Sequence, residues 1–334
     1  MDYINYVKQS PMMGVIGYGG GATSLGRYGS QGPGPFNGNR AIASGGGGPR
    51  INNIQYSSIS STGNFSDFGN LDAALYAPVA ASGGDVGGDA TRGLVMGGYG
   101  PAAAPNSRVD TIQYITIAST SNTSDFGNLA RASNNALGAV SNGPRIVHCG
   151  GYNDTLSPAT REEMDYVETL TTGNTTSFGN LASARYAGSG TGDGSRGILF
   201  GGYSPTNSID YITIATEGNS TDFGDLSANA STSSGSFGNG TLAFVGGIGE
   251  LGIDKITVQT TGNGTDVGDL TANRWGNPGC SNGSTGDRGI WMGGYDDGVN
   301  SNVVDYITMS SAGNATDFGN LHTATRGASG MSGD

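Results

Sequence analysis

The stretch NFSDFGNL at Asn64–Leu71 decides the fold of this chain, because close copies of it recur along the sequence. Each copy keeps an initial asparagine, a Phe-Gly or Val-Gly pair and a final leucine. The other copies are NTSDFGNL (Asn122–Leu129), NTTSFGNL (Asn174–Leu181), NSTDFGDL (Asn219–Leu226), NGTDVGDL (Asn263–Leu270) and NATDFGNL (Asn314–Leu321). Their glycines lie 58, 52, 45, 44 and 51 residues apart. This period predicts one supersecondary unit stacked repeatedly, because a single unit cannot bury its own apolar face.

Two further patterns accompany each copy and predict four short strands per unit. One is an apolar run that ends in a glycine pair, such as LVMGGY at Leu94–Tyr99. The other is a strand such as IQYITIAS at Ile112–Ser119, whose central position precedes the Phe or Val of the repeat by twelve residues in every copy. Because this spacing has no insertion, we expect a tight hairpin with a Gly-Asn turn, such as Gly63-Asn64, in which both residues suit positive φ.

An arginine precedes the glycine pair by five residues in five units, and Thr241 lies near this place in the remaining unit. We expect each arginine to tie a loop to the neighbouring unit through backbone carbonyls or an aspartate; a ligand-binding arginine ring is the alternative. The arginines are Arg40, Arg92, Arg145, Arg196 and Arg288.

A unit of about fifty residues with four strands and a Gly-Gly pair closing the second resembles the kelch repeat, a blade of a β-propeller. The resemblance covers residues 37–334, although Phe replaces the Trp of the usual kelch pattern. The units begin with a second strand at Arg40–Gly46 and finish with RGASGMSG (Arg326–Gly333), which matches the first-strand region of the others. We therefore expect an all-β, six-bladed, kelch-like propeller, closed by pairing of the C-terminal strand with the first blade strand.

Composition excludes several classes of function. The chain has 334 residues, 63 of them glycine, and a formal net charge of −12. An acidic chain lacks the basic face that a nucleic-acid partner requires, and no apolar run reaches the roughly 18 residues that span a bilayer. The opening residues have no basic stretch followed by an apolar one, so we expect no Sec signal. Cys149 and Cys280 fall three units apart, so we expect two free, packed thiols and no disulfide.

Residues 1–36 do not match the repeat and are too short for a core of their own. They are glycine-rich after the opening MDYINYVKQSP, which carries more apolar side chains than a solubilising tail needs. We expect an N-terminal docking arm that orders on a partner; a disordered tail is the alternative. The predicted apolar anchors are Tyr3, Ile4, Tyr6, Val7, Met12 and Met13.

The opening MDYINYVKQSP together with the YITIAT and TDFGDL repeats resembles kelch-like propeller proteins of marine bacteriophages. The resemblance implies a virion location and a structural role, with the arm docked on other virion proteins. The propeller would then serve in host-surface adsorption, as a tail-fibre protein, or in decoration of the capsid or tail. The resemblance names neither the docking partner nor the copy number, and a homo-oligomer stays open. A secreted bacterial glycan-binding propeller is the alternative.

The catalytic residue types are sparse. The chain has two histidines, His148 and His322. His148 precedes Cys149, but successive side chains of a strand face opposite ways, so we expect no joint metal binding by this pair. Neither histidine lies beside a Gly-x-Ser-x-Gly elbow, and the glycine-rich stretches do not open helices. We therefore expect a protein that is not an enzyme and that needs no metal and no cofactor.

The six repeat asparagines also begin N-x-[S/T] sequons. Glycosylation would explain them in a eukaryotic secreted protein, but turn chemistry explains their period more simply.

The stretches after the glycine pairs vary in length and content, so recognition would reside there. They include residues 99–110, 152–163, 203–208 and 295–302. We expect several tyrosines to form a circle of aromatic side chains that stacks on sugars; the alternative is that the tyrosines only wedge between blades. The predicted ligand-binding residues are Tyr99, Tyr152, Tyr203, Tyr295 and Asp296.

Overall fold

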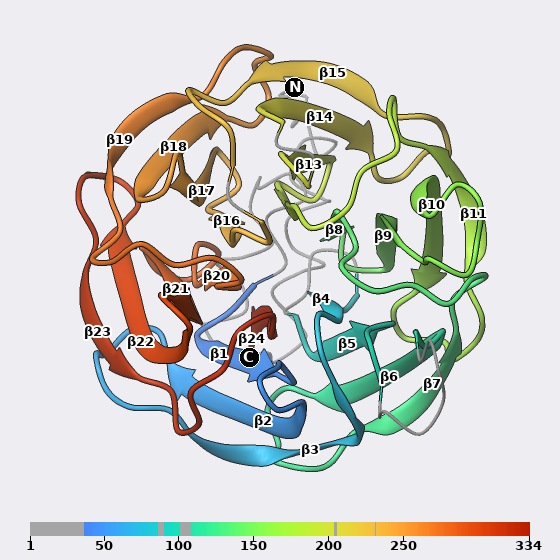
Figure 1. Cartoon of the computed structure of the whole chain (residues 1–334), viewed down its shortest axis with the longest axis horizontal. Helices are drawn as coiled ribbons and strands as arrows, with labels where there is room; N and C mark the ends of the chain where they lie inside the picture. The colour runs from blue at the N-terminus through green and yellow to red at the C-terminus, as the bar shows by residue number, and fades with distance from the viewer. Residues whose placement is uncertain (1–36, 86–89, 101–107, 204–205, 231) are drawn as a thin grey trace, which may run out of the picture. The chain divides into compact units, whose positions relative to one another are not determined.

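The computed structural model describes residues 37–85, 90–100, 108–203, 206–230 and 232–334. These residues form 24 β-strands and no helix. The strands make six antiparallel four-stranded sheets arranged around a central axis (Figure 1). The prediction of an all-β, six-bladed propeller is confirmed. The predicted docking arm at residues 1–36, with its apolar anchors, lies outside the described residues.

Each blade runs from an innermost strand beside the axis to an outermost strand. The first blade contains β24 (Ser329–Gly333), β1 (Arg40–Ser44), β2 (Ile51–Ser58) and β3 (Ser66–Leu75). The second contains β4 (Val79–Gly83), β5 (Arg92–Met96), β6 (Thr111–Thr116) and β7 (Ser124–Asn128). The third contains β8 (Gly138–Ser141), β9 (Arg145–Tyr152), β10 (Thr160–Glu168) and β11 (Thr176–Asn180). The fourth contains β12 (Ser189–Gly192), β13 (Arg196–Phe200), β14 (Ser208–Thr213) and β15 (Thr221–Asp225). The fifth contains β16 (Ser236–Gly238), β17 (Leu242–Ile248), β18 (Gly252–Thr257) and β19 (Thr265–Asp269). The sixth contains β20 (Gly279–Ser281), β21 (Arg288–Asp296), β22 (Val299–Thr308) and β23 (Thr316–Asn320).

The ring closes as the sequence predicts. The C-terminal strand β24 pairs antiparallel with β1, with Ser329 opposite Ser44 and Gly333 opposite Arg40. The hydroxyl oxygens of Ser44 and Ser329 lie 2.8 Å apart in a buried hydrogen bond. Closure therefore leaves no open edge between the first and sixth blades.

The hydrophobic core lies between the blades. One buried cluster combines Ile42, Ile54 and Phe68 of the first blade with Val95 and Ile115 of the second. Such clusters form because each sheet packs on a neighbour through both faces, so apolar side chains on both faces of a strand leave water. Each fully buried large side chain contributes about 1.5–3 kcal/mol.

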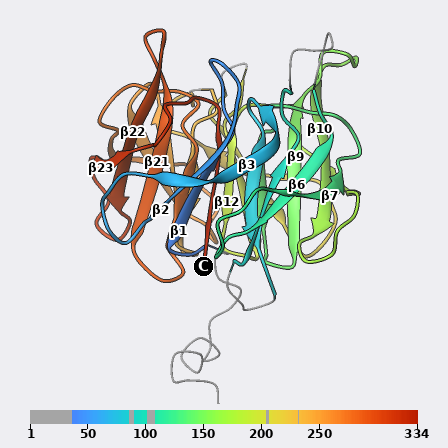
Figure 2. The same ribbon diagram turned by 90° about the horizontal axis from the view of Figure 1, so that it is seen from below.

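The propeller has two different faces (Figure 2). The hairpins from the third to the fourth strand of each blade, such as residues 59–65, lie on one side, which we call the hairpin face. The connections from the second to the third strand and from one blade to the next lie on the opposite side, which we call the loop face. Asn37, the first described residue, lies at the hairpin face, where its side-chain amide donates to the Gly238 carbonyl at 3.2 Å and to the Ser281 hydroxyl at 3.0 Å.

The prediction that Gly-Asn forms the turn of each hairpin is wrong. Seven residues separate the paired strands in every blade, and the chain reverses at once after the strand, as in the Ser119 N–H to Thr116 carbonyl bond of 3.2 Å. None of the six asparagines has positive φ. The Gly-Asn segment instead runs toward the preceding blade, where the asparagine side chain accepts a hydrogen bond.

Each repeat asparagine accepts a hydrogen bond from the preceding blade. The Asn122 side-chain oxygen accepts from the Asn70 backbone N–H at 3.0 Å, and the other five asparagines make the equivalent bond. The repeat glycine lets the two backbones meet, since a Cβ on Gly69 would lie 2.2 Å from the Ser121 carbonyl oxygen. We call this unit, present six times, the hairpin latch; it explains the periodic sequons.

The predicted structural role of the arginine ring is confirmed in four blades. Each of these arginines donates to a backbone carbonyl of the next blade and stacks on a tyrosine of its own blade: Arg40 to Ile117, Arg92 to Thr169, Arg196 to Val258 and Arg288 to Ile59. Arg145 differs, because it pairs with Glu168 of its own blade. In the fifth blade Leu242, opposite Thr257, occupies the arginine position, so Thr241 is one residue out of register.

Cys149 and Cys280 are buried free thiols, as predicted. Burial raises the pKa of both thiols, so neither is a thiolate at neutral pH. Among the described residues, no helix is long and apolar enough to cross a membrane.

Candidate binding surface on the loop face

The glycine pair turns the chain so that the next residue reaches the mouth of the central channel. Gly97 and Gly98 have φ of 62° and 114°, a conformation that favours glycine. Tyr99 then exchanges two backbone hydrogen bonds, of 3.0 and 2.7 Å, with Tyr76 from the connection between the first two blades. Equivalent residue pairs occur at the other blades: Gly47 with Arg326, Tyr152 with Asn134, Tyr203 with Tyr186, Ile248 with Ala230, and Tyr295 with Trp275.

Three tyrosines from the third and fourth blades form a continuous stack. The Tyr186 ring lies between the rings of Tyr152 and Tyr203, with centroid distances of 4.8 and 5.0 Å. Tyr203 is 52% exposed, which is unusual for so large a ring. Burial and the two neighbouring rings raise the pKa of Tyr186, so its hydroxyl stays protonated at neutral pH.

Arginines join the other rings. The Arg50 guanidinium lies 4.1 Å from the centroid of Tyr99, and Arg108 lies between Tyr99 and Tyr152 at 5.2 and 5.1 Å. A cation over a ring face in this range is attracted by the ring quadrupole. Arg108 also donates to the Asn134 side chain at 3.1 Å and pairs with Asp154.

The sixth blade contributes a second aromatic group. The Trp275 and Tyr295 rings lie 5.0 Å apart, and the Arg326 guanidinium is 5.3 and 3.9 Å from their centroids. Tyr76 lies nearby, since a Cβ on Gly327 would meet its ring at 2.6 Å. Burial raises the pKa of Tyr76, although Arg326 opposes this shift.

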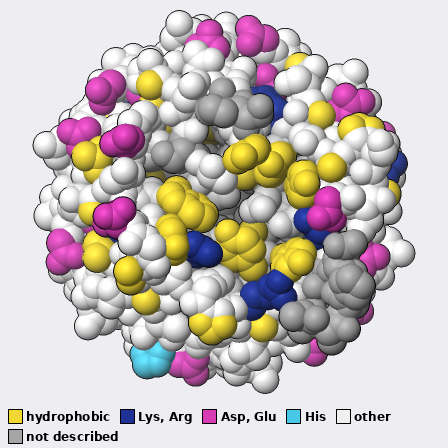
Figure 3. Space-filling model, in the orientation of Figure 1, with side chains coloured by type: hydrophobic (Ala, Val, Ile, Leu, Met, Phe, Trp, Pro, Cys, Tyr) yellow, Lys and Arg dark blue, Asp and Glu magenta, His cyan; other side chains and the backbone are white. Residues whose placement is uncertain are grey.

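Together these side chains form a crescent around the channel mouth, which we call the mouth belt. Figure 3 shows hydrophobic and arginine side chains around the central hollow, with most acidic side chains toward the rim. The crescent has a gap at the fifth blade, where the equivalent residues are Ala230 and Ile248. The mouth belt consists of Tyr76, Tyr99, Tyr152, Tyr186, Tyr203, Trp275, Tyr295, Arg50, Arg108 and Arg326.

The channel beneath the belt is narrow. Its upper cavity has a volume of about 90 Å³ and is lined by small residues of the inner strands, such as Ala80, Ala139 and Gly190. Pockets for small organic ligands usually enclose about 300–1,000 Å³. The cavity is therefore smaller than most sites for small organic ligands.

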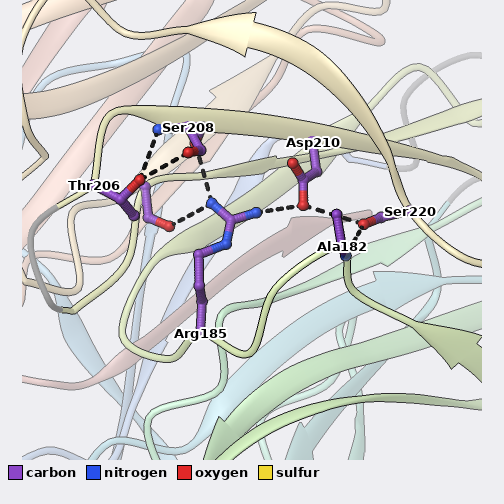
Figure 4. Close-up of polar contacts among 7 residues, drawn as sticks. Ala182, Arg185, Thr206, Ser208, Asp210 and Ser220 are labelled. Atoms are coloured by element: carbon purple, nitrogen blue, oxygen red, sulfur yellow. Dashed lines mark hydrogen bonds and ion pairs between the residues drawn. The ribbon is translucent and has the colours of Figure 1, made fainter.

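A second set of contacts holds the blades together near the loop face. The residue before the central position of each third strand is Gln or Asp, and in five blades it interacts with the connection from the preceding blade. We call this contact the loop clasp. Its chemistry varies: Gln113 accepts from the Asp72 N–H, whereas Asp210 pairs with Arg185 (Figure 4).

The third blade lacks this pairing. Asp165 is 8% exposed, and although its backbone pairs with β9 and β11, its carboxylate makes no hydrogen bond with a described residue. Ser133 stands where other connections carry Arg185 or Arg274, and its buried hydroxyl has no partner among the described residues. Burial raises the pKa of Asp165, Arg131 opposes the shift, and Glu163 adds to it.

The structure brings the four predicted tyrosines to one mouth. Asp296 is not part of the belt, because β21 and β22 extend as a hairpin and place it, exposed, near the tip. Tyr76, Tyr186, Trp275 and the three belt arginines were not among the residues predicted from the sequence. A signal existed for some: Tyr76, Tyr186, Trp275 and Arg326 each follow the repeat leucine by five residues.

Within the described part of the chain, no group of three His, Cys, Asp or Glu side chains could hold a metal ion. His148 is buried beside Cys149, and burial lowers its pKa to about 4. The imidazole is therefore neutral at physiological pH and packs as a core side chain.

No family model and no curated protein matches this chain. The fold places the chain among β-propellers, a class of scaffold that serves binding and structural roles.

Proposed function

We propose that this chain is a non-enzymatic structural protein of a bacteriophage virion. Residues 1–36 attach it to other virion proteins, and the loop face serves host-surface adsorption or decoration of the capsid or tail. The family to which the proposal refers is the kelch-like propeller proteins of marine phages, which the opening residues and the repeats resemble.

The observation that carries the proposal is the opposition of the two faces. The chain enters the propeller at Asn37, on the hairpin face, where Asn39 also bonds Asp334 at 2.7 Å. The varied connections lie on the other face. A protein attached through residues 1–36 would therefore leave its loop face accessible for recognition.

Removal of residues 1–36 tests attachment. We expect the truncated chain to keep its melting temperature, because none of the propeller's blade strands is removed. We also expect it to be absent from purified particles, because the docking arm is missing. Tyr203→Ala in the full chain is the matched control and should enter particles normally. Unchanged incorporation of the truncated chain would overturn the proposal.

The mouth belt favours a second candidate, a secreted bacterial propeller that binds glycans. A stack of half-buried and exposed aromatic rings offers both an apolar face and hydroxyl groups to a sugar. Sugar binding by a protein that never associates with particles would favour this candidate over the first.

A further inference from the structure

We propose that the mouth belt binds an acidic polysaccharide, with anionic groups held by Arg50 and Arg326 and sugar rings stacked on the tyrosines at either side. This inference rests on the proposed recognition role of the loop face, and it names the class of ligand. It holds for either candidate function.

Charge is unevenly distributed over the propeller. The chain carries 27 acidic and 15 basic residues, yet Arg50, Arg108 and Arg326 gather around the mouth. Among the described residues, only Arg108 of these three forms a salt bridge, with Asp154. A positive centre in an acidic protein attracts an anion locally while the rim repels acidic surfaces.

The guanidinium groups of Arg50 and Arg326 differ in their partners from those of the other arginines. The arginines of the inter-blade ring, such as Arg92, donate to backbone carbonyls, and Arg185 and Arg274 are paired with aspartates. In contrast, the side chains of Arg50 and Arg326 donate to no acceptor and form no salt bridge among the described residues, and both are partly exposed. Each contacts an aromatic face, which leaves its N–H edge available to a carboxylate or sulfate.

Cations and aromatic rings follow a definite order around the crescent. Arg326 lies next to Tyr295 and Trp275, and Arg50 lies next to Tyr99. From Tyr99 the crescent continues through Arg108 to the three-tyrosine stack. The two unpaired cations therefore lie between two aromatic arms, and one polymer can meet both.

The narrow channel excludes a compact ligand from the interior. Because the upper cavity holds only about 90 Å³, the ligand has to lie along the crescent. An extended chain of acidic sugars fits this path better than a single small anion does.

Calorimetric titration of the full chain with three polymers tests the inference: polygalacturonate, which carries carboxylates; dextran sulfate; and neutral dextran. We expect one or both anionic polymers to bind, with affinity that falls as salt rises, and dextran to bind at least about tenfold more weakly. Binding of polygalacturonate alone identifies carboxylate recognition, and binding of dextran sulfate alone identifies sulfate recognition.

Variants locate the site. Arg50→Gln and Arg326→Gln should each weaken binding about tenfold, and Tyr203→Ala several-fold. Lys255→Gln removes the same charge from β18, away from the belt, and should leave affinity unchanged. Because Arg326 is partly buried, its variant is used only if the melting temperature is retained, and Arg50→Gln supplies the test otherwise.

The inference is overturned by equal binding of dextran, by no binding of any polymer, or by an equal loss in Lys255→Gln and Arg50→Gln. These outcomes leave particle incorporation untouched, because that assay depends on residues 1–36. Failure of the ligand assignment and failure of the virion role are therefore distinguishable.

Discussion

The two faces of the propeller hold neighbouring blades together in different ways. On the hairpin face the same latch occurs six times, with an asparagine side chain, a glycine and a backbone carbonyl in the same places. On the loop face the clasp uses Gln113 in one blade, Asp254 in another and an Arg185–Asp210 pair in a third. The contacts between blades are therefore uniform on the hairpin face and differ from blade to blade on the loop face.

The largest effect should come from a latch glycine. Gly179 has φ of 152°, and a Cβ there would lie 2.3 Å from the Gly218 carbonyl oxygen. Since both partners are backbone, Gly179→Ala should lower the free energy of unfolding by about 3 kcal/mol. Chemical denaturation measures this value.

Gly298 on the loop face is the matched control. It has φ of 93°, but the nearest atom to its Cβ would be 4.0 Å away. Gly298→Ala should therefore cost only about 1 kcal/mol of backbone strain. Equal losses at the two glycines would break the contrast between the faces.

The third blade, which lacks the clasp, offers the next effect. A raised Asp165 pKa means that the folded state disfavours the ionised form, so this residue supports folding below its ordinary pKa of about 4 and loses that support as pH rises. Asp165→Asn should be more stable than the parent chain by about 1 kcal/mol at pH 7 and equal to it below pH 4. Thermal melts across pH 3–8 test this expectation.

Asp254 is the control for this substitution, because its carboxylate accepts from the Ser227 N–H and hydroxyl, both at 2.7 Å. Asn cannot accept both bonds at equivalent oxygens, so Asp254→Asn should destabilise by about 1–2 kcal/mol. A gain from both substitutions would show that the clasps do not differ as described.

A latch asparagine should give a smaller loss. Asn219 accepts from the Asn180 N–H at 2.9 Å in an exposed position, so water can replace it in part. Asn219→Ala should cost about 0.5–1.5 kcal/mol. Asn302 on the loop face is exposed and its side chain has no hydrogen bond among the described residues, so Asn302→Ala should change stability by less than about 0.5 kcal/mol.

The mouth belt should contribute little to stability. Tyr203 is half exposed and stacks on one ring, so Tyr203→Ala should cost less than about 1 kcal/mol. The same variant should lose affinity for acidic polysaccharide. A large loss of stability would instead support the alternative that the tyrosines mainly wedge the blades together.

Much of the fold was predictable because its signals are local and repeated. The apolar runs, the glycine pairs and the spacing of the repeat define four strands six times over, and Arg326–Gly333 supplies the missing first strand. The prediction of a Gly-Asn turn was wrong for a physical reason. Asn122 and its equivalents form hydrogen bonds with the preceding blade, and a local preference for positive φ does not reveal such contacts.

The candidate site was predictable only in part. The tyrosines after the glycine pairs stand out by position. Tyr186 and Trp275 instead occupy the fifth position after the repeat leucine, where the residue type differs from blade to blade. Arg50 and Arg108 belong to loops of different length, so no spacing links them to the rings that they contact.

The sequence alone determined the number of blades, the closing strand and the free state of both thiols, since each follows from a period of about fifty residues. The tertiary structure decided which side chains meet. Ring closure brings connections from different blades to one mouth, and only there do Tyr152, Tyr186 and Tyr203 become a single surface. Contacts between blades depend on rotation about the axis, which the linear order of residues does not contain.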